Sequence, residues 1–131
     1  MPAPDEQPRT TVDVVTDDAL GHDDAVGLLA RLGRREVSAA ELADAARARA
    51  ERAHAVLNAV ATWVEPDQCP PGDGPFAGLP TLVKDNEALA GLPTSEGSAA
   101  VPDRPAEASS PWVTQFVGLG FAPVAKTTLP E

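Results

Sequence analysis

Residues Gly78–Asn86 read GLPTLVKDN, and this segment decides the predicted fold of the chain. A short apolar run follows a turn-rich stretch and leads directly into a lysine, an aspartate and an asparagine. The run predicts a buried strand over Thr81–Lys84. The chain of 131 residues has only ten Lys and Arg. A cation at the end of a core strand therefore needs an explanation.

The residues after this segment predict a second strand parallel to the first. A long connection rich in Gly, Pro and Ser leads to Ser110, which can cap a helix that has Pro111 at its first position. Trp112, Val113, Phe116 and Val117 are predicted to form the buried face of that helix. Gly118 or Gly120 can end it, and FAPVAKT (121–127) then reads as a strand. A strand, a crossover helix and a strand indicate a parallel pair.

Lys84 is the candidate catalytic residue of the chain. The carboxyl end of a parallel strand points into the crevice where open α/β folds place their sites. Burial favours the neutral form of an amine, which is a competent proton acceptor. Asp85 and Asn86 could fix its geometry by hydrogen bonds. An edge lysine that reaches water explains the same spacing, and on the residues alone that interpretation is favoured.

The upstream half predicts a loose tail, two helices and one more strand. Residues 1–22 are expected to be a polar N-terminal tail, and residues 23–131 the folded part. A short helix begins near Asp23 and ends with a left-handed turn at Gly33. A longer helix starts with a capping box between Ser38 and Glu41, and AVATWV (59–64) then reads as a strand.

Composition and charge exclude several classes of function. The formal net charge of −10 argues against nucleic acid or an anionic membrane as a partner. The single cysteine, Cys69, excludes an internal disulfide, and the two histidines are distant in sequence. We therefore expect no metal site and no cofactor. The first residues lack an apolar segment of signal-peptide length, so a cytoplasmic location is expected.

Two further segments suggest other chemistry, but the residues argue against it. GFAPVAKT (120–127) departs from a phosphate-binding loop because Ala125 replaces the second glycine, and the proline in TLPE argues against the helix that should follow. We expect Lys126 to have a structural role or to support the site without touching the substrate. The hydroxyls of Thr94, Ser95 and Ser98 lack a nucleophile elbow and a nearby histidine in sequence, so they are expected to stabilise their loop.

Taken together, GLPTLVKDNEALAGLPTSEGS and SSPWVTQFVGLGFAPVAKTTLPE resemble the amidase signature family. The upstream segment REVSAAELADAARARAERAHAVLNAVAT resembles the N-terminal helix of that family. The departures are Ala125, where the family usually has Gly, and Thr128, where Asn is frequent. The resemblance implies part of an α/β fold, with a mixed or parallel sheet and flanking helices. It also implies amide hydrolysis by a Ser–cis-Ser–Lys triad, with Lys84 as the base.

The triad is incomplete in these residues. In the family, both serines belong to a Gly/Ser-rich segment that follows the motif matched by KTTLPE. We therefore interpret the chain as the N-terminal part of an amidase that acts on a small amide and is inactive alone. The alternative is an inactive remnant or an interaction-only protein. A hydrolase of 6-aminohexanoate cyclic dimers or oligomers is an alternative substrate branch. Self-association of the shortened chain is also expected.

Overall fold

Three helices and three strands make up the described part of the chain. The computed structural model describes residues 11–129. The elements follow in the order α1 (Ala25–Gly33), α2 (Ala39–Leu57), β1 (Val60–Trp63), β2 (Pro80–Lys84), α3 (Pro111–Gly118) and β3 (Ala122–Thr127). All six elements were predicted from the sequence, with ends shifted by a few residues. The α/β class with a partial mixed sheet and flanking helices is confirmed.

The helix starts are set by local sequence. Ser38 accepts a hydrogen bond from the Glu41 amide, and the Glu41 carboxylate accepts from the Ser38 amide, so the capping box is present. Asp24 caps α1, and Ser110 caps α3 with Pro111 at its first position. These caps satisfy amides that have no partner within their own helix.

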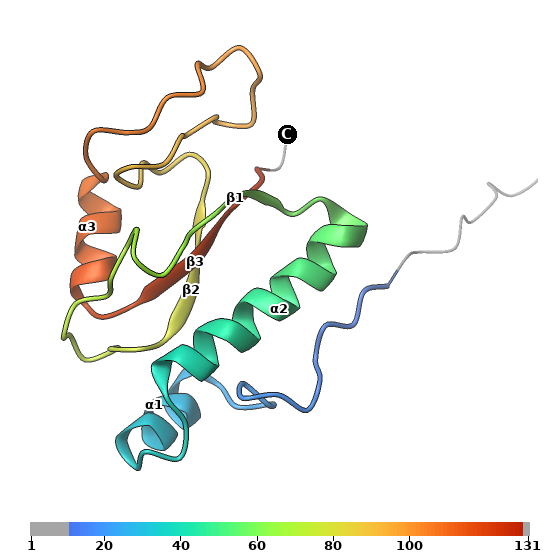
Figure 1. Ribbon diagram of the computed structural model, residues 1–131, viewed down its shortest axis with the longest axis vertical. Coiled ribbons are helices and arrows are strands. Elements are labelled where there is room, and N and C mark those ends of the chain that lie inside the picture. The colour runs from blue at the N-terminus through green and yellow to red at the C-terminus, as the bar shows by residue number, and fades with distance from the viewer. Residues whose placement is uncertain (1–10, 130–131) are drawn as a thin grey trace, which may run out of the picture.

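The sheet has the strand order β1-β3-β2. β2 runs parallel to β3, as predicted, and β1 runs antiparallel to it. β3 is the central strand and is mostly buried, whereas β1 and β2 are edge strands. Figure 1 shows the three strands between α2 on one side and α3 on the other.

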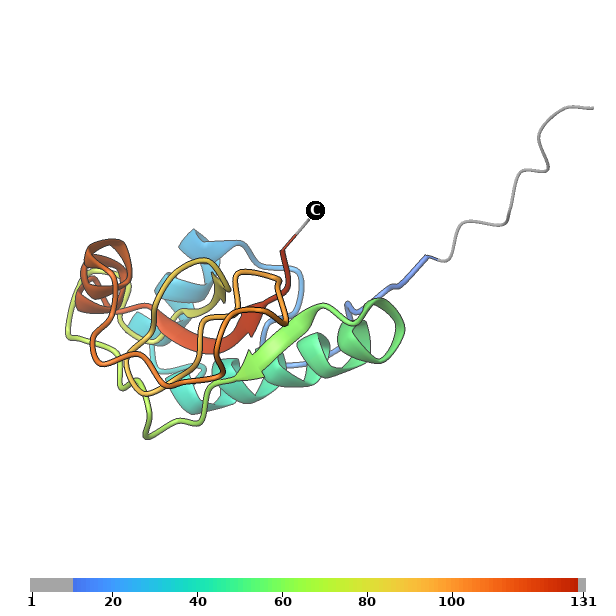
Figure 2. The ribbon, with the colours of Figure 1, turned by 90° about the horizontal axis from the view of Figure 1, so that it is seen from above.

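Two apolar clusters hold these layers together. One lies between α1, α2 and the start of β2 and contains Leu28, Val37, Leu42 and Leu79. The other lies between β2, the segment after it and α3, and contains Val64, Val83, Leu89, Leu92 and Val113. We call the side of the sheet that α2 covers the helix face, and the opposite side, under residues 86–110, the loop face. Figure 2 shows α2 lying along the sheet in a second view.

A register shift in β3 decides which side chains reach each face. Thr81 pairs with Pro123 and Leu82 with Ala125, so β3 has one residue, Val124, more than β2 at this point. Such an extra residue changes the alternation of the side chains that follow it. After the shift, Val83 pairs with Lys126 and shares the loop face with it.

The structure corrects three expectations. Gly33 does not supply the left-handed turn after α1, because the positive φ of 57° belongs to Arg35. Trp112 is not part of the buried face of α3, because it is 48% exposed and stacks on Phe116. Residues 1–10 lie outside the described residues, but Ala19 and Leu20 pack against the cluster under α2, so the packed part begins before residue 23.

Candidate functional site

The carboxyl ends of β2 and β3 meet at one edge of the sheet. Lys84 is the last residue of β2, and it pairs with Thr127 at the end of β3. The side chain of Lys84 is exposed, so the edge-lysine interpretation that the residues alone favour fits this chain, and the buried lysine does not. β2 is an edge strand, and the residues that line the cavity between it and α2 include Leu82 but not Lys84. The candidate catalytic lysine thus lies on the helix face, open to solvent.

The buried lysine is Lys126. Its side chain has no exposed area, and its ammonium group has three oxygen neighbours on the loop face. The Nζ atom lies 2.8 Å from Asp85 Oδ1 and donates to Thr94 Oγ1 at 2.8 Å and to the Pro93 carbonyl at 2.5 Å. Two of these contacts are hydrogen bonds, and the third is an ion pair with the Asp85 carboxylate.

Asp85 is bonded from the opposite direction by Ser95. The Asp85 side chain is 2% exposed, and its Oδ2 accepts from the Ser95 amide at 3.0 Å and from the Ser95 hydroxyl. Asp85 therefore does not bond to Lys84 as expected, because consecutive residues of a strand point to opposite faces. The exposed Asn86 is likewise not among the groups that bond to Lys84 in the described residues.

The charge of Asp85 is stabilised inside the protein. Burial alone would raise the pKa of this carboxyl group, but the hydrogen bonds from Lys126 and Ser95 outweigh that effect. The pKa of Asp85 therefore lies below its usual value. Asp85 and Lys126 form a buried ion pair, and the hydrogen bonds that each makes to the loop at residues 93–95 connect this loop to β2 and β3.

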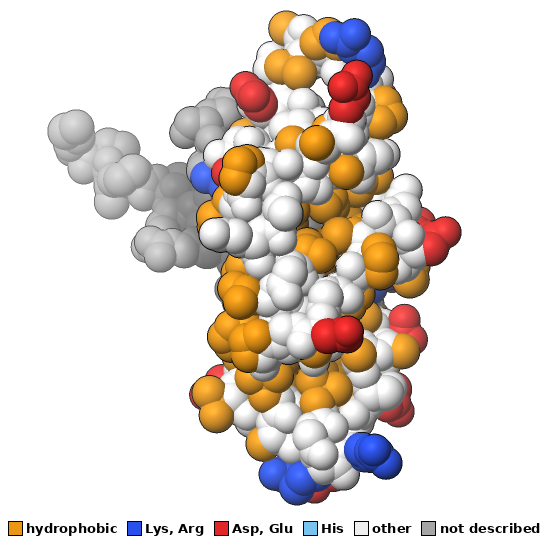
Figure 3. Space-filling model, turned by 90° about the vertical axis from the view of Figure 1, so that its left-hand side faces the viewer, with side chains coloured by type: hydrophobic (Ala, Val, Ile, Leu, Met, Phe, Trp, Pro, Cys, Tyr) orange, Lys and Arg blue, Asp and Glu red, His pale blue; other side chains and the backbone are white. Residues whose placement is uncertain are grey.

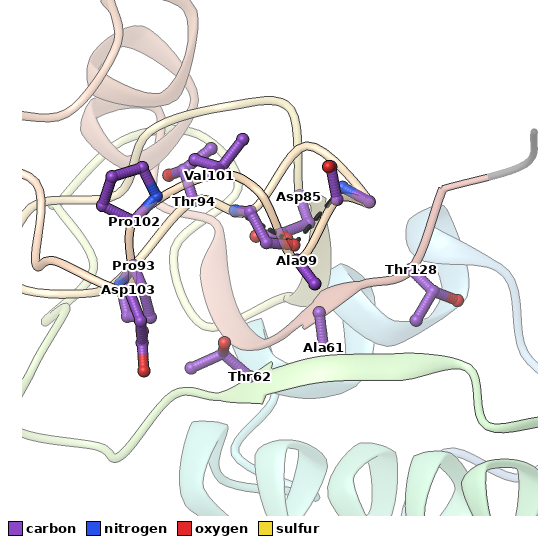
Figure 4. Close-up of a pocket in the computed structure, with 13 residues that line it drawn as sticks. Ala61, Thr62, Asp85, Pro93, Thr94, Ala99, Val101, Pro102, Asp103 and Thr128 are labelled. Atoms are coloured by element: carbon purple, nitrogen blue, oxygen red, sulfur yellow. Dashed lines mark hydrogen bonds between the residues drawn. The ribbon is translucent and has the colours of Figure 1, made fainter.

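A cavity of about 440 Å³ lies beside this ion pair on the loop face. Figure 4 shows Asp85 and Thr94 on one side of it, Thr62 below and Thr128 to the right. Ala99 comes from the loop that covers it. Lys84 does not line this cavity, because its side chain points to the other face.

The loop hydroxyls have the structural role predicted for them. Thr94 accepts from Lys126, Ser95 bonds to Asp85, and Ser98 accepts from the Ala100 amide. Each hydroxyl therefore holds the loop.

The remaining reactive groups do not form a site in residues 11–129. Within that range, no three His, Cys, Asp or Glu side chains lie close enough to hold a metal ion. Desolvation raises the pKa of the half-buried Cys69 thiol, which disfavours the reactive thiolate. No helix of the described range is long and apolar enough to cross a bilayer. The absence of a cofactor and the cytoplasmic location stay predictions.

Sequence comparison places these residues among known amidases. A family model described as Amidase matches residues 30–131. The "Putative amidase AmiC" of Mycobacterium tuberculosis is 37% identical over 126 residues, which are 92% of this chain and 27% of that protein. Its counterpart in Mycobacterium leprae is 36% identical over 119 residues, covering 88% of this chain and 25% of that protein. The chain thus spans about a quarter of the length of these relatives.

Solved structures show the same arrangement of elements. A 6-aminohexanoate cyclic dimer hydrolase complexed with substrate superposes with a TM-score of 0.74 at 25% identity, covering 83% of this chain and 24% of that one. An amidase family protein from Bacillus anthracis superposes with a TM-score of 0.62 at 20% identity, covering 84% of this chain and 26% of that one. The second likeness shows the fold alone.

Proposed function

This chain belongs to the amidase family, and from that premise we propose that it forms the N-terminal part of an amide C–N hydrolase in which Lys84 is the base. The single observation that carries the proposal is the position of Lys84. It ends a strand within the motif GLPTLVKDN, at the sheet edge where the parallel strands β2 and β3 both end. Lys126, the other lysine of the chain, is occupied by three oxygen contacts and is enclosed by protein.

The proposed reaction is acyl transfer followed by hydrolysis. The neutral amine of Lys84 accepts a proton through a bridging serine, and a second serine attacks the carbonyl carbon of the amide. The C–N bond breaks, the departing amine takes the proton, and water then hydrolyses the acyl-serine ester. By resemblance to the family, both serines belong to a segment outside residues 1–131.

Because Lys84 is exposed, its proposed role as a base requires that another segment of the complete protein covers it. A neutral amine needs a site with little water around it, because burial disfavours the charged form. In the described residues the helix face beside Lys84 is open, and Leu82 on the same face is 46% exposed. We infer that the serine-bearing segment covers this part of the helix face in the complete protein.

The test is a pair of substitutions in the complete protein, meaning residues 1–131 together with the serine-bearing segment. Lys84→Ala should lower kcat by at least the ~10²–10⁴-fold typical of a lost general base, with a smaller change in KM. Lys126→Ala should lower kcat less, in protein whose circular dichroism shows it folded. Near wild-type turnover by folded Lys84→Ala would refute the proposal.

Residues 1–131 alone are expected not to hydrolyse amides, because they contain one of the three triad members. Pure protein should give no turnover with aliphatic or aryl amides. Turnover that is lost on Lys84→Ala would contradict this expectation. An inactive remnant or interaction-only protein is the alternative, and it predicts that the native coding sequence lacks a Gly/Ser-rich segment after residue 131.

A narrower substrate class has one observation in its favour. The structure of the 6-aminohexanoate cyclic dimer hydrolase gives a TM-score of 0.74 with this chain. We therefore propose cyclic or oligomeric 6-aminohexanoate amides as the first substrates to assay. A kcat/KM for acetamide or benzamide at least as high as that for the cyclic dimer would exclude this branch while leaving amide hydrolysis intact.

Self-association of the isolated chain is the last part of the proposal. Exposed apolar side chains lie on both faces, among them Leu82 near the edge of the sheet and Trp112 and Leu119 on and just after α3. Figure 3 shows hydrophobic side chains spread over one side of the molecule with few charged groups between them. An unpaired strand edge and uncovered apolar groups favour association. A monodisperse monomer in sedimentation that binds no hydrophobic dye would refute it.

A further inference from the structure

The backbone on both sides of the Lys84–Asp85 peptide is held by hydrogen bonds. The Asp85 amide donates to the Thr127 carbonyl at 3.0 Å, and the Asp85 carbonyl accepts from the Glu96 amide at 3.2 Å. The Lys84 carbonyl accepts from the Glu87 amide at 2.9 Å. The chain direction at the end of β2 is therefore set by β3 and by the loop at residue 96.

The buried ion pair strengthens this hold from the loop face. Asp85 Oδ1 contacts Lys126 Nζ at 2.8 Å, and Oδ2 is bonded to Ser95. Lys126 in turn bonds the carbonyl of Pro93 and the hydroxyl of Thr94. The residue that follows Lys84 is thus connected through one carboxylate to the central strand and to the loop, while the Lys84 side chain stays free on the helix face.

We propose that Asp85 and Lys126 are positioning residues for Lys84. The proposal rests on the proposed function of Lys84 as a base. A proton acceptor must be held within about 0.5 Å of its productive place. Lys84 itself has a long, flexible side chain, so the place where its Cα lies is set by its neighbours. Asp85 shares a peptide with Lys84 and has the only carboxylate that contacts Lys126 within residues 11–129.

Stability alone does not explain why a buried ion pair, and not a pair of apolar side chains, is present at this place. Replacing a buried ion pair by apolar residues of similar volume is often neutral or stabilising, by ~1–4 kcal/mol. Apolar side chains would fill the same space, but they would not bond Ser95, Thr94 and the Pro93 carbonyl in fixed directions. The directional contacts therefore favour a geometric role.

The experiment compares variants of the complete protein. The single variants are Asp85→Asn and Lys126→Met, and the double variant is Asp85→Leu with Lys126→Met. The matched control is Glu36→Gln, which removes a carboxylate from the exposed Arg34–Glu36 pair on the connection between α1 and α2. Each variant is measured for its melting temperature, for kcat and KM, and for amide hydrogen exchange in the peptide that covers residues 82–87.

The single variants should exchange hydrogen at residues 82–87 at least about tenfold faster than wild type, which corresponds to ~1.4 kcal/mol of opening free energy. Their kcat should fall by up to about 10²-fold, the effect of a misplaced catalytic group, with KM nearly unchanged. The double variant should recover the melting temperature but keep the fast exchange and the low kcat. Glu36→Gln should match wild type in every measurement.

Three results would decide against the proposal or separate it from the proposed function. Unchanged exchange in folded single variants overturns it. Recovery of kcat together with melting temperature in the double variant also overturns it, because the pair then acts through stability alone. If the single variants do not fold, the hydrogen exchange and the kcat of the double variant are compared with wild type, and wild-type values for both overturn the proposal. Full activity of Lys84→Ala would refute the role of Lys84 as the base. Fast exchange at residues 82–87 in the Asp85 and Lys126 variants would still show that the ion pair holds the end of β2.

Discussion

Lys84 and Lys126 belong to neighbouring parallel strands, and their side chains lie on opposite faces of the sheet. Lys84 is paired with Thr127 and is exposed, whereas Lys126 is paired with Val83 and is fully buried. They are the only lysines in the 131 residues. One amine is therefore free to react, and the other is enclosed in an ion pair.

This difference predicts selective chemical modification. A limiting amount of an amine-acylating reagent should modify Lys84 in the folded chain and leave Lys126 intact, because Lys126 has no exposed area. Peptide mapping by mass spectrometry distinguishes the two sites. In the urea-unfolded chain, both lysines should react alike. Equal modification of Lys126 and Lys84 in the folded chain would contradict the burial of Lys126.

The depressed pKa of Asp85 predicts a dependence of stability on pH. The unfolded chain binds a proton on Asp85 more readily than the folded chain does, so the free energy of unfolding rises with pH. This contribution is present above the ordinary carboxyl pKa of about 4 and is lost as the pH falls below it, through the lower pKa of the folded state.

Asp85→Asn removes this titration and leaves Lys126 with an uncompensated charge. Breaking a buried pair on one side costs ~3–5 kcal/mol, so the variant should unfold at lower urea concentration at neutral pH. Its stability should also fall less than that of wild type between neutral pH and pH about 3. Urea titrations across this range measure both effects. Parallel pH curves for the two proteins would show that Asp85 is not ionised in the folded chain.

Local sequence was sufficient to predict the elements and the caps at the helix starts. The bonds of Ser38 with Glu41, and of Ser110 within its own helix, join residues a few positions apart, so short motifs describe them fully. The parallel pairing of β2 with β3 also followed from the order of elements, because a crossover helix brings the second strand back in the same direction.

The difference in exposure between the two lysines could not be predicted in the same way, although an exposed Lys84 was one of the two interpretations of its segment. It depends on strand order, which makes β2 an edge, and on the extra residue Val124, which changes the alternation before Lys126. The apolar run before Lys84 indicates a strand but contains no information on what covers its end. The partners of Lys126, Pro93 and Thr94, are 33 and 32 residues away in sequence. Such contacts are set by the tertiary fold.

The ion pair between Asp18 and Arg49 predicts that residues 16–22 are fixed to α2. Arg49 binds both carboxylate oxygens of Asp18, at 2.6 and 2.8 Å, and also bonds the Gly21 carbonyl at 2.8 Å. The hydrogen bonds from Arg49 hold the pKa of Asp18 well below its usual range. Asp18→Asn should lower the free energy of unfolding by ~1.5–3 kcal/mol, the range for hydrogen bonds to charged groups.

The matched control for Asp18 is its neighbour Asp17, which is exposed. Asp17→Asn should leave the urea midpoint within error of wild type. Limited proteolysis should cut residues 11–22 faster in Asp18→Asn than in Asp17→Asn, because only the first loses its hold on α2. Equal protease resistance of the two variants would mean that the pair does not fix this segment.

The turn between α3 and β3 gives the last prediction. Gly120 has a φ of +103°, and a Cβ atom there would come within 2.4 Å of the Ala77 amide nitrogen. The Gly120 carbonyl also accepts a hydrogen bond from Gly78, the first residue of the segment that leads into β2. Gly120→Ala should therefore destabilise the chain by at least ~1–3 kcal/mol, because both the backbone conformation and the space exclude a side chain.

Gly118→Ala is the matched control. Gly118 lies at the end of α3, and no atom lies within 4 Å of a Cβ added there. This variant should gain ~0.5–1 kcal/mol of helix stability. Thermal unfolding of both variants measures the difference. A Gly120→Ala protein as stable as Gly118→Ala would mean that the loop before β2 does not lie against this turn in solution.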